Sequence, residues 1–274
     1  MSRLARIVRK LGLIAVSDLV TGDKLRYALN SAGRNSGVCT YRLRGAVSVA
    51  LRKGTSDSKV FDEIFVERMY APYLAALPDN LGRVILIDLG ANIGLSALYF
   101  ARELSARKLA IGEIIAVEPD PDNFRLLSEN LRRAGLANRS IAVCAFAGAE
   151  RAFAELHDPG NGAWGMRMGP LSDTGTLVLP LAEIAAMAKT AAPLLLKCDI
   201  EGGERQLFLH IRDWEHLIQY IFLELHTEFL TVQEMFTCLE SSGFQWMIHG
   251  TPPAGASIAL LLLERGERRN QPEA

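Results

Sequence analysis

The chain has 274 residues, of which 49% are hydrophobic and 22% are charged, a balance typical of a globular protein. Its 30 basic and 31 acidic residues give a net charge of -1, which offers no electrostatic support for a nucleic-acid partner. The four cysteines are far apart and form no CxxC pair. We therefore expect buried thiols in a reducing, cytoplasmic environment, with neither a disulfide framework nor a zinc site.

The N-terminal part of the sequence predicts a small α/β extension. In MSRLARIVRKLGLIAV, basic residues accompany four apolar residues at helical spacing, so we expect an amphipathic helix that caps the fold. Weak contact of this helix with an anionic membrane surface is the alternative. A strand pair over CTYRLRGAVSVALRKG follows, and then a helix over TSDSKVFDEIFVERMY that Ser56 or Asp57 could cap. No apolar run approaches the roughly 18 residues that span a bilayer.

From Arg83 onward the hydrophobic pattern alternates between strands and helices, which predicts a doubly wound, mostly parallel sheet. The five expected strands are VILIDL, EIIAVE, SIAVCAF, PLLLKCDI and IQYIFLELH. The helices expected between and after them cover residues 93–105, 122–134, 181–189, 204–210 and 231–242. The glycine-rich stretch 148–180 is expected to form a hairpin or a lid-like insertion.

Two late strands, 244–249 and 256–263, have no helical pattern between them, so we expect an antiparallel hairpin at a sheet edge. Such an ending is unusual for a nicotinamide-binding domain and typical of the class I methyltransferase fold. The predicted fold is thus α/β and Rossmann-like, with a mostly parallel seven-stranded sheet, a terminal antiparallel hairpin and the N-terminal extension. The predicted domains are the extension over 1–80, the methyltransferase domain over 81–265 and a flexible tail over 266–274.

The turn after the first strand, DLGANIG, indicates what the fold would bind. Ligands of such sheets lie beyond the carboxyl ends of the strands. Gly90 and Gly94 are spaced G-x-x-x-G, with Asn92 between them, whereas a dinucleotide loop reads G-x-G-x-x-G. Asp88 precedes this turn, and its carboxylate would repel a pyrophosphate. It suits a cationic ligand with an ammonium and a sulfonium group, such as S-adenosylmethionine.

Glu118 ends the second strand, 24 residues beyond Gly94. An acid at this position can accept hydrogen bonds from both hydroxyls of a ribose, and Pro119 would then border the adenine. The order of acid, glycine turn, helix, strand and terminal acid predicts S-adenosylmethionine as the cofactor, with NAD as the main competitor.

Acidic residues also follow the fourth strand, in LLLKCDIEGGERQLF. Asp199 and Glu201 are two residues apart on an extended end, so both side chains could line the ligand cleft. One could position the methionine ammonium or the acceptor, and another could act as a general base. Glu201 and Glu204 could instead cap the following helix and complement its dipole. A shared divalent cation is a further alternative, but no set of histidine and aspartate residues at ligand spacing accompanies these acids, so no metal site is predicted.

Glu224 and His226 end the fifth strand beside the same expected cleft. His226 could take a proton in catalysis or be a structural histidine with its hydrogen bonds satisfied. In the insertion, Trp164, Met166 and Met168 could cover the acceptor site, although ordinary packing is the simpler interpretation.

Five segments of the chain resemble the FkbM family of S-adenosylmethionine-dependent methyltransferases: TSDSKVFDEIFVERMY, IDLGANIGLSALYFA, IAVEPDPDNFRLLSENL, LLLKCDIEGGE and FLELH. The resemblance implies a class I methyltransferase fold and methylation of a hydroxyl oxygen, on acceptors such as sugars and polyketides. It implies that the cofactor is held by Asp88, Gly90, Asn92, Gly94 and Glu118. Asp199 and Glu201 would flank the reacting centre, and Ser56 and Asp57 would close the cleft.

The sequence therefore predicts an S-adenosylmethionine-dependent O-methyltransferase that acts on a small-molecule or glycan acceptor, with no nucleic-acid partner. Asp199, Glu201 and His226 are the predicted catalytic residues, and Asp199 is also expected near the cofactor. An NAD(P)-dependent oxidoreductase and a non-catalytic ligand-binding protein of the same fold are the alternatives.

Overall fold

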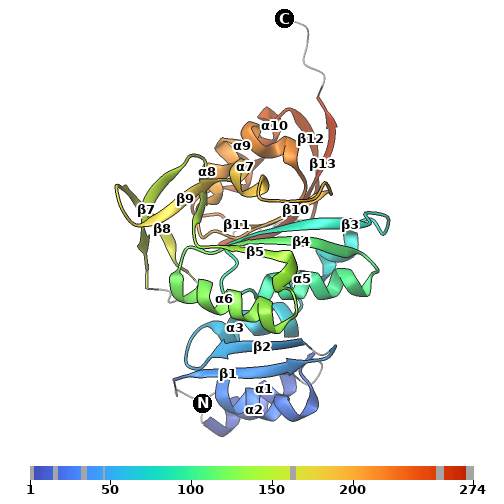
Figure 1. The fold of residues 1–274 in the computed structure, drawn as a ribbon, viewed down its shortest axis with the longest axis vertical. Helices are drawn as coiled ribbons and strands as arrows, with labels where there is room; N and C mark the ends of the chain where they lie inside the picture. The colour runs from blue at the N-terminus through green and yellow to red at the C-terminus, as the bar shows by residue number, and fades with distance from the viewer. Residues whose placement is uncertain are drawn as a thin grey trace, which may run out of the picture.

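The computed structural model describes residues 3–14, 18–31, 36–45, 47–160, 165–250 and 256–269. The N-terminal extension lies at one end of the molecule, against one layer of the main domain (Figure 1). Its elements are α1 (Arg3–Ile14), α2 (Thr21–Ser31), β1 (Val38–Leu43), β2 (Val47–Arg52), α3 (Asp57–Phe61), the π-helix η1 (Asp62–Val66) and α4 (Ala71–Ala76). β1 and β2 pair antiparallel. The predicted N-terminal α/β extension is confirmed.

The first helix packs onto this extension. Ile14 is fully buried, and Ile7 and Leu11 are partly buried against the same apolar core, while Arg9 is exposed. The apolar face of α1 is therefore buried within the fold. This burial favours the prediction that the helix covers the end of the fold. Within the described residues, no helix has both the length and the apolar character needed to cross a membrane.

A seven-stranded sheet forms the centre of the main domain. Its strands are β3 (Arg83–Leu89), β4 (Ala110–Val117), β5 (Ser140–Val143), β10 (Leu194–Cys198), β11 (Ile218–His226), β12 (Phe244–His249) and β13 (Ile258–Arg268). They follow the order β12-β13-β11-β10-β3-β4-β5, and β13 is antiparallel to both of its neighbours. The mostly parallel sheet with a terminal antiparallel hairpin is as predicted. β13 continues to Arg268, beyond the predicted strand end and into the predicted tail, while the division into domains stays a prediction.

Helices cover both faces of this sheet (Figure 1). They are α5 (Leu95–Ala106), α6 (Pro121–Arg133), η2 (Ala137–Arg139), α7 (Leu181–Ala185), α8 (Glu204–Leu209), α9 (Ile211–Trp214), η3 (Glu215–Leu217) and α10 (Val232–Ser241). The side chains of β3 show why both faces of the sheet must be covered by other elements. Val84 and Leu86 join the core shared with the extension, whereas Ile85 and Ile87 join the core on the opposite face. A continuous apolar strand of this kind is buried on both sides.

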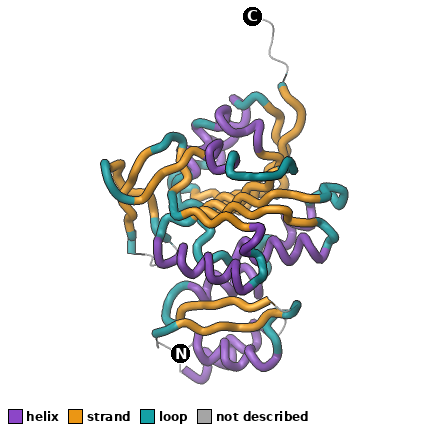
Figure 2. Tube along the Cα trace, viewed as in Figure 1, coloured by secondary structure: helices purple, strands orange, loops and turns teal. Residues whose placement is uncertain are grey.

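The stretch 148–180 is more elaborate than the predicted hairpin. It contributes to a separate four-stranded sheet in the order β6-β9-β7-β8, which lies beside the large sheet (Figure 2). Its strands are β6 (Phe146–Gly148), β7 (Ala152–His157), β8 (Arg167–Ser172) and β9 (Thr176–Pro180). The predicted third strand, SIAVCAF, is therefore wrong as a single element, because β5 belongs to the large sheet and β6 begins the small one.

Candidate functional site

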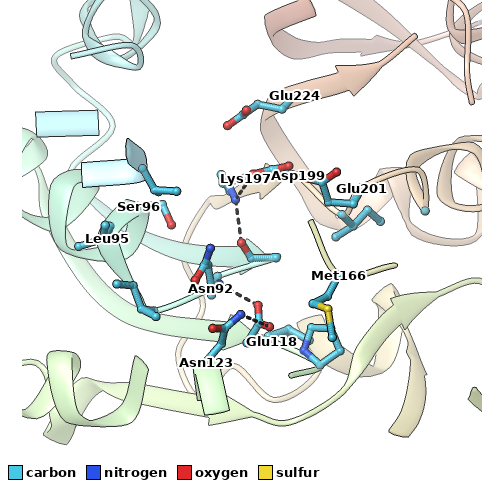
Figure 3. A pocket seen from close by; sticks show the side chains of 18 of the residues that line it. Asn92, Leu95, Ser96, Glu118, Asn123, Met166, Lys197, Asp199, Glu201 and Glu224 are labelled. Carbon is cyan, nitrogen blue, oxygen red and sulfur yellow. Dashed lines mark hydrogen bonds and ion pairs between the residues drawn. The ribbon is translucent and has the colours of Figure 1, made fainter. Parts of the chain in front are cut away.

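A cleft lies at the carboxyl ends of β3, β4, β10 and β11, where the class of fold places its ligands. Its empty space is about 1330 Å³, including the part open to solvent. The cleft is lined by seven of the predicted site residues: Gly90, Asn92, Glu118, Pro119, Asp199, Glu201 and His226. Figure 3 shows the side chains of several of these residues gathered around it from separate strands. Asp88 and Gly94 are not among the described residues that line it.

The glycines of the first turn are required by the packing of the protein itself. Gly90 has a φ of 68°, and a Cβ placed on it would lie 1.7 Å from the backbone oxygen of Asp199. Gly94 has a φ of 87°, and a Cβ there would lie 2.8 Å from Cδ1 of Leu127. Both positions favour glycine because their backbone is left-handed, and at Gly90 the backbone of Asp199 also excludes a side chain. The sequence predicted the glycines from ligand approach, and the structure adds contact between β3 and β10 as a reason.

Asp88 lies beneath the cleft, completely buried. Its Oδ2 accepts a hydrogen bond of 2.6 Å from Ser96 Oγ, and its Oδ1 lies 3.5 Å from Lys197 Nζ. Burial raises the pKa of this carboxyl group. The side chain thus anchors the neighbouring strand β10, and direct contact with a cofactor stays a prediction.

Lys197 ties the ends of β3 and β10 together. Its Nζ donates to the Gly90 carbonyl oxygen at 3.0 Å and to Asp199 Oδ2 at 3.2 Å, as the dashed contacts in Figure 3 show. Burial alone would lower the pKa of Lys197, but the charges of Asp199, Asp88 and Glu224 outweigh it and raise the pKa. The ammonium group therefore stays charged and fixes the turn relative to Asp199. Lys197 lies within the segment LLLKCDIEGGERQLF, but the sequence did not indicate this role.

Glu118 is 4% exposed at the end of β4, and N–H groups surround its carboxylate. The backbone N–H of Asn92 donates to Oε2 at 2.8 Å, while Asp120 N and Asn123 Nδ2 donate to Oε1 at 3.0 and 3.2 Å. Burial nevertheless raises the pKa of Glu118 to about 7. Next to it, the buried Oδ1 of Asn92 has no hydrogen-bond partner among the described residues. These oxygens can accept hydrogen bonds from a ligand in the cleft.

His226 connects the acids that follow β10. Its Nδ1 lies 3.0 Å from Glu204 Oε1, whereas its Nε2 lies 3.5 Å from Glu201 Oε2 and 4.0 Å from Asp199 Oδ1. Burial would lower the pKa of His226, but Glu204, Asp199 and Glu201 raise it to about 9. Burial and the charge of Asp199 raise the pKa of Glu201 to about 7. At neutral pH, His226 is therefore protonated in this arrangement.

Glu204 has a structural role at the start of α8. Its carboxylate accepts the backbone N–H groups of Ile200 at 3.0 Å and Gly202 at 2.8 Å, besides contacting His226. The turn between these groups places Glu201 at a φ of 53°, a conformation that non-glycine residues adopt rarely. Glu204 thus holds the turn that carries Glu201, a structural role that differs from the predicted helix cap because both backbone donors precede α8.

The N-terminal extension supplies a wall of the cleft, but through other residues than the predicted Ser56 and Asp57, which do not line it. This wall is formed by Lys59, Val60, Glu63, Ile64, Met69 and Tyr70. The hydroxyl group of Tyr70 donates a hydrogen bond to Oε1 of Glu224 on β11. Burial and the charge of Asp199 raise the pKa of Glu224 to about 8. The extension and the main domain therefore build this side of the cleft together.

A second connection runs from the extension to Glu118. Asp57 Oδ1 accepts a hydrogen bond of 2.8 Å from Arg52 Nη2, which also donates to Asn123 Oδ1 at 2.7 Å. The amide of Asn123 in turn donates to Glu118. Ser56 precedes α3 without a capping hydrogen bond from its side chain, so its predicted capping role is wrong.

The small sheet borders the cleft as well. Met166 and Met168 line it, and Met166 lies near Glu118 in Figure 3. The prediction for Trp164 lies outside the described residues.

The strand order, the antiparallel position of β13 and the acid-lined cleft at the carboxyl ends of the strands define a class I methyltransferase fold. A family model described as "Methyltransferase FkbM domain" matches residues 88–246, more than half of the chain. The chain therefore belongs to the FkbM methyltransferase family. This assignment favours a methyltransferase over the NAD(P)-dependent oxidoreductase that the sequence left as an alternative.

Among curated proteins, the chain is similar to 31-O-demethyl-FK506 methyltransferase FkbM of Streptomyces tacrolimicus. The two are 27% identical over 239 residues, which cover 75% of this chain and 88% of that protein. Among solved structures, methyltransferase FkbM from Methylobacillus flagellatus is 19% identical with a TM-score of 0.43, covering 69% of this chain and 45% of that one. M. jannaschii TYW2 in complex with AdoMet is 13% identical with a TM-score of 0.46, covering 86% and 88%. The chain thus spans less than half the length of the M. flagellatus structure.

Proposed function

We propose that the protein transfers the methyl group of S-adenosylmethionine to a hydroxyl oxygen of a small-molecule or glycan acceptor. The observation that carries the proposal is the position of Glu118. Its buried carboxylate faces the same cleft as Asp199 and Glu201, in a chain of the FkbM methyltransferase family. The cofactor would lie between the end of β4 and the end of β10.

The chemistry of the cleft fits this cofactor. Glu118 would accept hydrogen bonds from the ribose hydroxyls, with Pro119 beside the adenine. The unpartnered Oδ1 of Asn92 would accept another hydrogen bond. Asp199 would face the positively charged methionine part of the cofactor. The concentration of acids also disfavours a pyrophosphate and a nucleic-acid backbone.

S-adenosylmethionine supplies an activated methyl group, so the residues of the chain mainly align the acceptor with it. Alignment of this kind can contribute about 7–11 kcal/mol to lowering the barrier. A general base for the acceptor hydroxyl contributes roughly 10²–10⁴-fold in rate. We assign this role to Asp199, since His226 is protonated at neutral pH. Glu201 and His226 would hold Asp199 and the acceptor in place.

Calorimetric titration with S-adenosylmethionine and with NADH tests the cofactor. We expect S-adenosylmethionine to bind, and tight binding of NADH without S-adenosylmethionine binding would overturn the proposal. Transfer of a radiolabelled methyl group to small molecules and glycans of a cell extract tests the reaction. Its loss in Asp199→Ala at a saturating cofactor concentration would support a role of Asp199 in the reaction itself. A protein that binds the cofactor but labels no acceptor would be the non-catalytic alternative.

The same proposal includes a cytoplasmic location. All four cysteines have free thiols, which suits a reducing compartment.

A further inference from the structure

We propose that Asp199, Glu201 and His226 form a binding site for a divalent cation on the acceptor side of the cleft. Each residue offers one ligand atom, and the three atoms lie within 4.8 Å of one another. Two carboxylates and one imidazole suit divalent ions such as Mn²⁺ and Zn²⁺. No histidine lies at ligand spacing from these acids along the chain, but the fold brings His226 on β11 beside the acids that follow β10.

The orientation of His226 is the main argument. Glu204 accepts two backbone N–H groups and is completely buried, so its contact with Nδ1 makes that nitrogen the donor. The other nitrogen, Nε2, then faces Asp199 and Glu201. A histidine that ligates a metal usually donates its second N–H group to a carboxylate in this manner.

The distances around Nε2 leave room for an ion. His226 is 5% exposed, yet the carboxylate oxygens nearest to Nε2 are 3.5 and 4.0 Å away. These distances exceed those of an ordinary N–H···O hydrogen bond. Nε2 thus pairs electrostatically with two oxygens but makes an ordinary hydrogen bond to neither, and a cation between the three atoms would take the place of the proton on Nε2.

The distribution of charge in the cluster also favours a bound cation. Lys197 neutralises part of the acidic cluster, but its Nζ is directed to Oδ2 of Asp199 and to Asp88. The Oδ1 of Asp199 and the carboxylate of Glu201 remain on the side of His226. A divalent cation placed there would replace the single proton of His226 and offset the repulsion between the two carboxylates with a larger charge.

The site itself stands independently of the proposed function, whereas its role in the reaction rests on that function. A cation would bind the acceptor hydroxyl and lower its pKa. The proton would pass to solvent, and the oxygen would form the new C–O bond as the C–S bond of the cofactor breaks, leaving S-adenosylhomocysteine. With the ion bound, Asp199 would be a ligand of the ion. The ion, in place of Asp199 as general base, would then make the acceptor hydroxyl acidic.

Titration of the EDTA-treated full chain with MnCl₂, followed by the electron paramagnetic resonance signal of free Mn²⁺, tests the site. We expect one Mn²⁺ per chain with a dissociation constant at or below about 10⁻⁴ M. Asp199→Asn and His226→Gln should abolish this binding, and Glu204→Gln should weaken it about 10- to 100-fold by releasing the histidine. Glu264→Gln is the matched control, because Glu264 pairs with His249 at 3.1 Å elsewhere in the sheet.

Circular dichroism establishes that each variant is folded, and Glu201→Gln gives a further ligand test at a partly exposed side chain. Absence of stoichiometric Mn²⁺ binding, or equal binding by wild type and the ligand variants, would overturn the site. Calorimetry with S-adenosylmethionine in EDTA separates this result from the proposed function. Cofactor binding without Mn²⁺ binding rejects the site and keeps the function, and the opposite pattern keeps the site and rejects the function.

Discussion

At the scale of single residues, Glu118 is buried while its carboxylate accepts several hydrogen bonds. Three N–H groups hold its carboxylate, but burial outweighs them, and the pKa rises to about 7. The charge of the residue proposed to hold the ribose therefore changes near neutral pH. An ionised carboxylate accepts hydroxyl hydrogen bonds at both oxygens, whereas the protonated acid loses one acceptor.

This behaviour predicts pH-dependent cofactor affinity. Because the group is mostly protonated at pH 6 and mostly ionised at pH 8, the affinity for S-adenosylmethionine should rise about tenfold across this interval. Calorimetry at several pH values measures the effect. In Glu118→Gln the affinity should be weaker and nearly independent of pH. An unchanged pH profile in the variant would show that another group is responsible.

Two glycines allow the cost of a left-handed backbone to be measured separately from the cost of a steric collision. Gly82 and Gly90 have similar φ values of 66° and 68°, but a Cβ on Gly82 meets nothing within 4 Å. We expect Gly82→Ala to lower the free energy of unfolding by about 1–2 kcal/mol through its left-handed backbone. Gly90→Ala should cost more than about 4 kcal/mol or prevent folding, because its Cβ would collide with backbone. Urea unfolding of both variants measures the difference, and equal losses would contradict the collision.

Most of the residues that gather at the cleft could be predicted from the sequence. Their arrangement within the cleft could not. DLGANIG and Glu118 were identifiable because each follows a buried strand in an alternating pattern. The position of Asp88 beneath the cleft depends on Lys197, which comes from a strand distant in the chain. The spacing of residues along one segment carries no information about such a partner.

At the scale of elements, Asn130 on α6 joins three segments. Its Oδ1 accepts the N–H of Ala50 at 2.7 Å, and its Nδ2 donates to the carbonyl oxygens of Ala50 at 3.1 Å and Ile93 at 2.8 Å. The side chain is completely buried. It therefore links β2 of the extension to the glycine turn and to the helix behind it.

Removal of the Asn130 amide group should lower the free energy of unfolding. Asn130→Ala leaves three buried backbone groups without partners, and each unsatisfied group costs about 1–3 kcal/mol. We expect a marked decrease in the free energy of unfolding, measured by urea denaturation. Asn138→Ala is the matched control, because Asn138 is exposed and its change should stay within about 0.5 kcal/mol. Similar losses in the two variants would show that Asn130 is not a link.

The strands and helices of the large sheet were mostly predictable, since their apolar periods differ clearly. The third strand was not, because SIAVCAF is apolar from Ile141 to Phe146 although β5 and β6 belong to different sheets. Hydrophobicity records that a segment is buried but not the sheet in which it lies. For the same reason, the four strands of the small sheet could not be distinguished from a hairpin.

At the scale of the whole molecule, the extension and the cofactor side of the cleft are coupled. The contacts run from Asp57 through Arg52 and Asn123 to Glu118, although Asp57 does not line the cleft. The sequence indicated an N-terminal extension but no path from it to Glu118. That path depends on how β2 packs against α6, which no local pattern encodes.

This coupling predicts an effect at a distance. Asp57→Asn should weaken S-adenosylmethionine binding by about 0.5–2 kcal/mol, because Arg52 would no longer hold the amide of Asn123. Calorimetry on the folded variant measures it. Asp23→Asn is the matched control, since Asp23 accepts hydrogen bonds from the backbone and side chain of Arg42 just as Asp57 does from Arg52. Unchanged affinity in Asp57→Asn, or an equal loss in Asp23→Asn, would contradict the coupling.

The place of β13 in the sheet has a consequence for synthesis of the protein. β12 is made before β13, yet its partner in the sheet is β13, which lies between it and β11. β12 cannot take its place until β13 has left the ribosome. The edge of β11 that β13 will cover is therefore open while the last strands are being translated. Completion of the sheet therefore waits for β13 to emerge, and chaperones that shield open strand edges would act during this interval.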